Sequence, residues 1–523
     1  MKKQWDVKFD GRSLGSGEII STIFDKRGIE DFSHFLNPNE DDLIPLDRLH
    51  NIDKAFEIID EGLTMNYKFE VIFDTDCDGI TAGSIMYKWF KNFTNNVTTY
   101  INEGKEHGVK NYDISICDAD IIIIVDSINE PECYEKFKGK QVIVLDHHII
   151  PDNFNANVTL VSSANDYPNP QLSGAGVVWK FCKYCDEMFL TDYADNLVDL
   201  ATCGLIADMM DMTSVENRYI CSLGFNNVQN TGIKKINGSY KFDSQAVSFG
   251  IAPLVNAANR LNLNTEALKL FISDDEKEVA KTVKNLKSAK EEQNTIVSDL
   301  MPSIREQAKS QLDNKVMFFV VDTDAGISGL IANKLIAEYQ RPVFVLKKTD
   351  KGYAGSGRGY GIEDFRQLCE GCGFTVMGHP EAFGVSIDTD KFQEAFDRLN
   401  ESLKDVEFNI TINCDAEIEI SNITNNLVES VMEINKISGM GFPTIKFSIT
   451  ISDYEVFTMS GGKHLKLICD NILFIKWNYK GSIDEMIANS EKHMPIRMCG
   501  TLTSSWFGRK KTTQFIIDEL EVI

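Results

Sequence analysis

Short apolar strands alternate with helical stretches from residue 68 onward, and this alternation restricts the fold more than any other feature. Residues 68–73, 97–101, 121–125 and 141–145 have the pattern of strands, and residues 79–91 that of a helix. Because strands separated by helices usually pair in parallel, we expect a mostly parallel sheet covered by helices. Ligands of such sheets gather at the carboxyl ends of the strands. The chemistry of the chain should therefore be sought there.

The rest of the chain indicates further domains. Helical sequence covers residues 172–210, and a long polar helix is expected over residues 274–312, kinked or divided at Pro302. A second strand and helix alternation begins at residue 316, and after residue 404 short strands spaced by turns are typical of a small barrel or sandwich. The expected order is an N-terminal extension (1–60), an α/β domain (61–270), a connector helix (271–315), a second α/β domain (316–404) and a C-terminal β-barrel domain (405–523).

The charge of the chain limits its partners. Lys and Arg number 53 against 78 Asp and Glu, a net charge of −25. Such a field repels phosphate at long range, which excludes a general polyanion binder. Residues 461–523 differ, because nine Lys and Arg against seven Asp and Glu give them a net of +2, so any nucleic acid should bind locally. Clustered acids can instead hold a divalent metal, which reverses the local field where a phosphate would lie.

The sequence shows no membrane helix or signal peptide, and its cysteines do not form a disulfide framework. No apolar run approaches the roughly 18 residues of a membrane helix, and a charge interrupts the N-terminal residues before a signal-peptide core forms. We expect a cytoplasmic protein with no membrane partner. The 12 cysteines are too sparse for a disulfide framework. Two CxxC pairs, Cys182/Cys185 and Cys369/Cys372, lack partners at ribbon spacing, which favours ordinary thiols over structural zinc.

The sharpest chemical signal is residues 74–79, DTDCDG, where an apolar strand ends and a helix begins. Its carboxylates, Asp74, Asp76 and Asp78, alternate and raise one another's pKa unless a cation holds them. A calcium loop of the EF-hand type needs a Glu at its twelfth position, which is Ile85 here. The segment therefore indicates another kind of divalent-cation site.

More acids and a histidine pair occupy similar places. Asp126 and Asp146 each follow an apolar strand directly, and His147 and His148 come next. The chain has only 8 histidines, so an adjacent pair beside carboxylates favours a functional site that suits Mn²⁺ or a similar ion. Asp208 lies in an apolar helical stretch, where a salt bridge between helices and a role in the site are both open. Together these groups can hold two divalent ions about 4 Å apart, the arrangement for phosphoester hydrolysis.

In order, these motifs resemble the four motifs of the DHH phosphoesterase superfamily. Other segments resemble the signatures of its RecJ family of single-stranded-DNA exonucleases. They are residues 172–176, Pro253 with residues 256–260, residues 355–358, Gly378-His379 with Ala382 and Gly384, and residues 441–447, 463–467 and 506–508. The resemblance extends from about residue 40 to the end of the chain.

The resemblance implies a DHH catalytic domain, a DHH-associated α/β domain and an OB-like nucleic-acid-binding barrel. It also implies two Mn²⁺ or Mg²⁺ ions. One ion would be held by Asp74, Asp76 and Asp126, and the other by Asp78, Asp126, His147 and Asp208, so that Asp126 bridges them. His148 would contact the scissile phosphate, and Asp146 would orient its neighbours.

A pocket for a 5′-phosphate is implied at Arg260, Ser356 and Arg358, with His379 near the same phosphates. The planar fork of arginine suits such a terminal group. Taken without the resemblance, residues 355–358 are more often just a turn. Residues 105–108 resemble a loop that lines the strand path, or they form a plain surface turn.

Three positions depart from the family pattern. Asn259, Gly359 and Met377 stand where the family has Gly, Ser and Gly. These changes alter the accessory domain and can change product length or end preference. None removes a metal ligand, so we expect an active enzyme.

The implied activity is metal-dependent hydrolysis of single-stranded DNA from 5′ to 3′, in repair or recombination, through a cleft too narrow for duplex. We expect a monomer, with a helicase or a single-strand-binding protein as candidate partners. The alternative is a phosphatase or hydrolase of very short RNA, bisphosphonucleotides or cyclic dinucleotides. Residues 405–523 favour a polymeric substrate, because Trp477 and Trp506 can stack on bases while nearby cations contact phosphates. The alternative is that the aromatic residues belong to the core of the barrel and the cations to a solvated surface. A non-catalytic scaffold would have lost metal ligands, and all are present.

Overall fold

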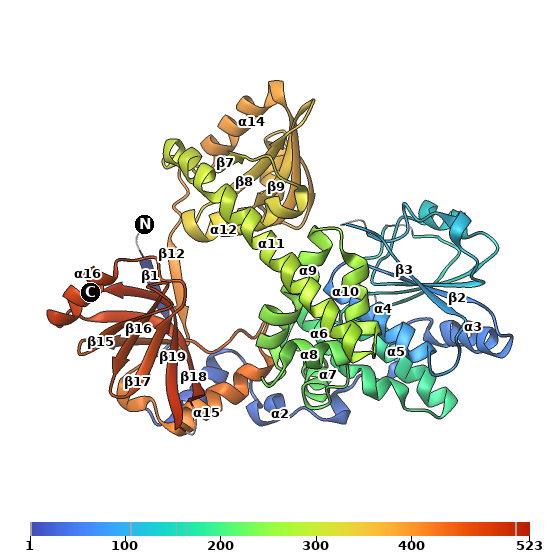
Figure 1. Ribbon diagram of the computed structural model, residues 1–523, viewed down its shortest axis with the longest axis horizontal. Coiled ribbons are helices and arrows are strands. Elements are labelled where there is room, and N and C mark those ends of the chain that lie inside the picture. The colour runs from blue at the N-terminus through green and yellow to red at the C-terminus, as the bar shows by residue number, and fades with distance from the viewer. Residues whose placement is uncertain (1–2, 105–106, 153, 165, 508–509) are drawn as a thin grey trace.

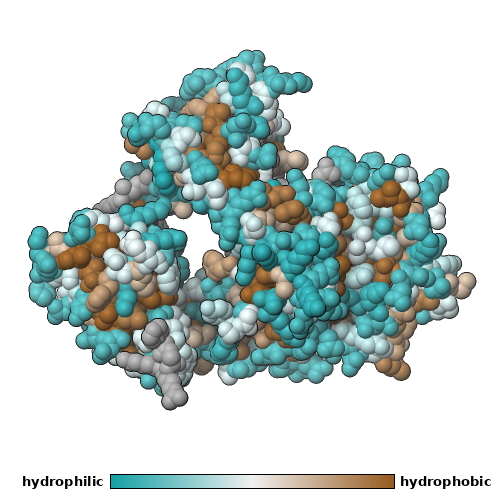
Figure 2. Space-filling view, in the orientation of Figure 1, coloured by the Kyte–Doolittle hydropathy of each residue, from teal (hydrophilic) through white to brown (hydrophobic). Residues whose placement is uncertain are grey.

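The computed structural model describes residues 3–104, 107–152, 154–164, 166–507 and 510–523. Figure 1 shows a first α/β lobe, a second α/β lobe above it and a β-rich C-terminal lobe. The long helix α11 (Glu276–Ala308) runs from the first lobe to the second. Pro302 lies inside α11 without dividing it. Figure 2 shows an open passage between the three lobes.

The first lobe contains the parallel sheet that the sequence predicts. Its strand order is β3-β2-β4-β5-β6, and every pairing is parallel. The strands are β2 (Phe69–Phe73), β3 (Val97–Ile101), β4 (Ile121–Val125), β5 (Gln141–Asp146) and β6 (Thr159–Ser162). All of β2 and β4 is buried, as expected of a parallel sheet covered on both faces.

The two faces of this sheet are covered differently. Ile121, Ile123 and Val125 point into the core formed with the helices, whereas Ile122 and Ile124 pack against a layer of loops and short 3₁₀ turns. Helices therefore cover only one face. The helices of this lobe are α3 (Ile52–Thr64), α4 (Cys77–Phe90), α5 (Gly174–Phe189), α6 (Val198–Ala207), α7 (Val215–Asn226), α8 (Thr231–Asn237), α9 (Ala252–Arg260) and α10 (Asn264–Ile272).

The second lobe is a smaller α/β unit. Its sheet has the order β10-β11-β9-β8-β7, in which only β7 and β8 pair in parallel. Its elements are β7 (Met317–Val320), α12 (Ala325–Tyr339), β8 (Val343–Lys348), β9 (Gly352–Arg358), α13 (Phe365–Gly371), β10 (Thr375–Gly378), β11 (Ala382–Asp388) and α14 (Thr389–Ser402).

The C-terminal lobe is built on a seven-stranded sheet with the order β13-β14-β18-β19-β17-β16-β15. Its elements are β12 (Ile410–Cys414), β13 (Ala416–Ile418), α15 (Asn425–Ile434), β14 (Phe447–Ile451), β15 (Glu455–Met459), β16 (His464–Cys469), β17 (Ile472–Lys476), α16 (Ile483–Glu491), β18 (Ile496–Phe507) and β19 (Lys510–Val522). The β-rich character expected of this segment is confirmed.

The N-terminal segment joins two lobes. Strand β1 (Lys3–Val7) pairs in parallel with β12. Helices α1 (Ser16–Lys26) and α2 (Phe32–Leu36) bring Phe24 and Phe35 against Phe442 of the C-terminal lobe, with ring centroids 5.8 and 4.9 Å apart. The first lobe, this segment and the C-terminal lobe therefore share one hydrophobic core. Across the described ranges, the structure has no helix that is both long and apolar enough to cross a membrane.

Candidate metal centre

Three carboxylates stand where β2 ends and α4 begins. Asp74 follows β2 directly, and Asp76 caps α4, its side chain accepting from the Gly79 amide at 3.0 Å. Asp78, in the first turn of α4, accepts from the amides of Gly174 and Ala175 at 2.7 and 3.1 Å. The amino end of α5 thus fixes Asp78, and the positive end of its helix dipole favours the charged carboxylate.

Asp126 lies at the centre of the cluster. It follows β4 with a left-handed backbone (φ 55°), a conformation that aspartate tolerates better than most residues. A Cβ on Gly174 would come within 2.3 Å of Asp126 Oδ1, so only glycine at position 174 leaves room for this carboxylate. The site therefore depends on glycine at this position.

Asp146 ends β5 and holds the two histidines that follow it. Its Oδ1 accepts from the amide of His147 at 2.7 Å and contacts Nδ1 of His148 at 2.8 Å, while Oδ2 accepts from the Ile128 amide. These bonds occupy both oxygens of Asp146. Its geometry is that of a residue that orients its neighbours.

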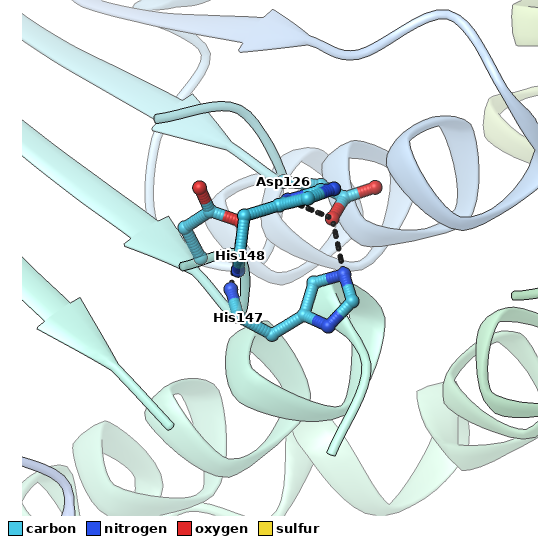
Figure 3. Close-up of side chains that lie close together, drawn as sticks. Asp126, His147 and His148 are labelled. Carbon is cyan, nitrogen blue, oxygen red and sulfur yellow. Dashed lines mark hydrogen bonds and ion pairs between the residues drawn. The ribbon is translucent and has the colours of Figure 1, made fainter. Parts of the chain in front are cut away.

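His147 points into the acids. Its Nε2 lies 3.2 Å from Asp126 Oδ1 (Figure 3). The same nitrogen lies 3.3 Å from Asp208 Oδ2 and 3.9 Å from Asp78 Oδ2. Asp208 is the C-cap of α6, so four separate segments meet here. His148 lies beside Asp126, with Nδ1 3.8 Å from Oδ1.

Two buried atoms at this point, Asp126 Oδ1 and His147 Nε2, make no hydrogen bond with the described residues. An unsatisfied buried acceptor beside an imidazole nitrogen is costly unless a cation lies between them. The ligand atoms of Asp74, Asp76 and Asp126 lie within 4.8 Å of one another, and so do those of Asp78, His147 and Asp208. This donor set fits divalent ions, and carboxylates combined with an imidazole favour a transition ion such as Mn²⁺ over Mg²⁺.

The pKa values of the cluster point the same way. Burial and the neighbouring carboxylates raise the pKa values of Asp76, Asp78 and Asp126, and burial with Asp78 raises the pKa of Asp208 to about 8. Burial lowers the pKa of His147, which keeps its imidazole neutral and able to bind a metal. A divalent cation would offset the repulsion among these carboxylates.

The residues expected to bind a terminal phosphate come together in part. Ser356 and Arg358 lie on β9 and Arg260 at the end of α9, and α12 contacts both, through Gly329 and Gly326 respectively. Arg358 is close enough to Arg260 to lower its pKa, although burial is the larger cause. Ser356 hydrogen-bonds to Ser328 at 2.8 Å. The two guanidinium groups and two hydroxyls form a cationic, hydroxyl-lined site without a carboxylate ion pair among the described residues.

His379 stands apart from that group. It lies on the turn between β10 and β11, and its exposed side chain makes no hydrogen bond or ion pair with the described residues. The hairpin places Ala382 opposite Arg358. His379 is thus carried by the strand that pairs with β9, without contacting the pocket.

Two residues outside the predicted site set also contact the centre. His107 places Nδ1 2.9 and 3.0 Å from the oxygens of Asp74. Asn259 donates from Nδ2 to the carbonyl of Thr75 at 2.8 Å. The sequence singled out the segment of His107 and the departure at Asn259, but nothing in the pattern placed either side chain at the metal-binding loop. Lys105 and Glu106 of the same segment lie outside the described residues.

Comparison with known proteins agrees with this geometry. Residues 68–218 match the family model described as the DHH family, N-terminal domain. The chain is 29% identical to YorK, an SPbeta prophage-derived protein of Bacillus subtilis named as a single-strand DNA-specific exonuclease, over 96% of each chain. It is 26% identical to the single-stranded-DNA-specific exonuclease RecJ of Bacillus subtilis, over 96% of this chain and 67% of that protein.

A solved structure shows the same fold. RecJ from Thermus thermophilus in complex with Mn²⁺ matches with a TM-score of 0.79 at 20% identity, covering 100% of this chain and 80% of that one. The fold match includes all three lobes, because it spans the whole chain. Residues 68–218 therefore form a DHH-family domain, and the chain as a whole has the fold of RecJ.

Proposed function

We propose that this protein is a metal-dependent exonuclease that hydrolyses phosphodiester bonds of single-stranded DNA from the 5′ end towards the 3′ end. The observation that carries the proposal is the pair of buried atoms, Asp126 Oδ1 and His147 Nε2, that meet at 3.2 Å inside a ring of acids. Relatives that match along 96% of the chain are named as single-strand DNA-specific exonucleases, which supports the choice of substrate.

The residues divide into two ligand sets around one shared carboxylate. Asp74, Asp76 and Asp126 would hold one ion, and Asp78, Asp126, His147 and Asp208 the other. Two bound divalent ions supply an activated water and neutralise charge on the attacking and leaving oxygens. The chain's part is to hold the carboxylates together at fixed positions, where the bound ions would keep them charged, and to keep the imidazole of His147 neutral.

His148 would act on the substrate. Its Nδ1 faces Asp146 at 2.8 Å, and this hydrogen bond raises the pKa of His148 to about 9. The imidazole is therefore cationic near neutral pH, and its Nε2 hydrogen remains available to the scissile phosphate. Asp146 acts through His148 by fixing the ring and its charge.

The remaining lobes suit a polymer better than a dinucleotide. Figure 2 shows a passage between the lobes, and the C-terminal lobe exposes Trp477 and Trp506, on which bases can stack. Arg260, Ser356 and Arg358 would take a 5′-phosphate. A function in repair or recombination, with a helicase or a single-strand-binding protein as partner, is part of this proposal.

The test compares three substrates with Mn²⁺ present: a long 5′-phosphorylated single strand, its duplex and a dinucleotide. We expect the single strand to release mononucleotides faster than the duplex or the dinucleotide is hydrolysed. A label at its 5′ end should be released before a label at its 3′ end. Asp76→Ala should abolish release, whereas Asp313→Ala, an exposed acid remote from the cluster in sequence, should not. Faster hydrolysis of the dinucleotide than of the single strand would instead favour the small-substrate alternative.

A further inference from the structure

His107 enters the metal centre from a segment that carries none of the other ligands. It lies between β3 and β4, and its Nδ1 faces both oxygens of Asp74 at 2.9 and 3.0 Å. The Asp74 carboxylate is almost fully buried, whereas the imidazole is partly exposed. The exposed imidazole of His107 therefore contacts the buried carboxylate of Asp74 through Nδ1.

The distances resemble those of the histidine already placed in the centre. His147 Nε2 lies 3.2 and 3.3 Å from its nearest carboxylate oxygens, those of Asp126 and Asp208. Adjacent ligands of one six-coordinate ion are also about 3 Å apart, since each lies about 2.1 Å from the ion and they meet at a right angle. His107 thus has the spacing of a ligand neighbouring Asp74. It lies outside the group that Asp74, Asp76 and Asp126 form within 4.8 Å, so its ring would move towards Asp76 and Asp126 to share their ion.

The loop around His107 is held in place on both sides. The buried Asn102 donates to the carbonyl of Gly108 at 2.7 Å, and the buried Asn264 donates to the carbonyls of Asn102 and Gly104, both at 2.7 Å. Gly108 adopts a left-handed backbone (φ 66°), which suits glycine at the residue after the histidine. Buried amides thus fix Gly104 and Gly108, which argues against a plain surface turn.

We infer that His107 is a fourth protein ligand, through Nδ1, of the ion that Asp74, Asp76 and Asp126 would hold. This inference rests on the proposed metal centre. It gives each ion one imidazole, where the sequence motifs alone leave the first ion with carboxylates only. Imidazole favours transition ions over Mg²⁺, so His107 should make this site prefer Mn²⁺ to Mg²⁺.

The test measures metal binding by calorimetry on the full-length, metal-stripped protein. In the His107→Ala variant, one of the two Mn²⁺ sites should weaken by roughly 10- to 100-fold, and Mg²⁺ binding should change far less. His493→Ala is the matched control, because His493 pairs with Asp453 at 2.8 Å on the surface of the C-terminal lobe. It should leave both affinities unchanged.

Pulsed electron paramagnetic resonance of bound Mn²⁺ separates a ligand from a mere ion pair. Wild type should show nitrogen couplings from two imidazoles, and His107→Ala from one. His107→Asp should restore binding without restoring the second nitrogen. Unchanged Mn²⁺ affinity and nitrogen couplings in His107→Ala would overturn the inference and leave the proposed function standing, whereas Mn²⁺ binding that survives Asp76→Ala would count against the metal centre itself.

Discussion

Asn259 donates from Nδ2 to the backbone carbonyl of Thr75 at 2.8 Å, which ties α9 to the loop between Asp74 and Asp76. The next residue, Arg260, belongs to the cationic site at α12 and β9. Adjacent residues of α9 thus contact the two sites: Asn259 contacts the metal-binding loop, and Arg260 is the group proposed to hold the terminal phosphate. A glycine at position 259 could not make this bond.

Replacing Asn259 with Ala should therefore disturb both sites slightly. Losing a buried hydrogen bond leaves the Thr75 carbonyl unsatisfied, at a cost of about 1–3 kcal/mol. We expect a lower unfolding temperature and weaker Mn²⁺ binding, measured by calorimetry. Asn226→Ala is the control, because Asn226 makes a similar but exposed bond to the Ser222 carbonyl at the end of α7. Equal effects from both variants would show that Asn259 has no special link to the loop.

The stability of the metal-free protein should fall as the pH rises. The folded pKa of Asp208 is about 8, far above the value of a free carboxyl, so folding retains a proton that the unfolded chain loses above about pH 4. The folded pKa of His148 is about 9, so its contribution is present below about pH 6.5 and is lost towards pH 9. Both groups therefore lower stability between pH 6.5 and 8.

Thermal unfolding in EDTA should show this decline. With Mn²⁺ the trend should reverse, because the ligands bind metal only when deprotonated. Asp208→Asn should make the unfolding temperature of the metal-free protein less dependent on pH below about pH 6.5, where His148 does not contribute. A metal-free protein that gains stability from pH 6.5 to 8 would contradict the pKa directions assigned here.

Arg358 should decide the preference for a phosphorylated 5′ end. Its Nε donates to Asn333 Oδ1 at 2.8 Å, which orients the guanidinium beside Arg260. Arg358→Ala should raise KM for 5′-phosphorylated single strands by roughly 10- to 100-fold, the worth of a charge-assisted hydrogen bond, and leave 5′-hydroxyl strands nearly unchanged.

Steady-state kinetics on the two substrates gives the comparison. Arg358→Lys should recover little, because lysine lacks the planar fork. Arg305→Ala serves as control, since Arg305 forms an ion pair with Glu338 at the surface. A uniform loss on both substrates would argue that Arg358 supports the lobe and not the phosphate.

The carboxylate and histidine cluster was predictable because its acids lie at the ends of apolar strands. Asp126 and Asp146 directly follow runs of apolar residues, and parallel strands bring such ends to one edge. The left-handed Leu190 that ends α5 has no such signal, so the break between α5 and α6 was missed. Strand β6 was missed too, being only four residues long.

Contacts between distant segments could not be predicted from the sequence. The approach of His107 to Asp74 spans 33 residues and depends on amides of Asn102 and Asn264 that no periodicity marks. Strands β15 and β18 were missed because mixed polar residues weaken their alternation. We expected helices to cover the first sheet, but loops and short 3₁₀ turns cover one of its faces. Such segments have no 3.6-residue period by which the sequence could predict them.

The attachment of the C-terminal lobe should depend on Arg218. Its guanidinium is buried, donates to the carbonyls of Phe35 and Ile437 at 2.8 and 3.0 Å, and stacks 3.8 Å from the Phe35 ring. No carboxylate pairs with it in the part of the chain that the structure describes. Arg218 therefore joins α2, α7 and the C-terminal lobe through backbone groups.

Arg218→Met should keep the apolar stem and remove these donors. The unsatisfied carbonyls should cost on the order of 3 kcal/mol, lower the first thermal transition and speed proteolysis between the lobes. Arg398→Met, which breaks only an exposed helix pair with Glu394, should cost less than about 0.5 kcal/mol. Because Arg218 touches no metal ligand, Mn²⁺ affinity should survive while binding of long single strands weakens. If strand binding holds while the lobes loosen, the C-terminal lobe contributes little to the substrate path.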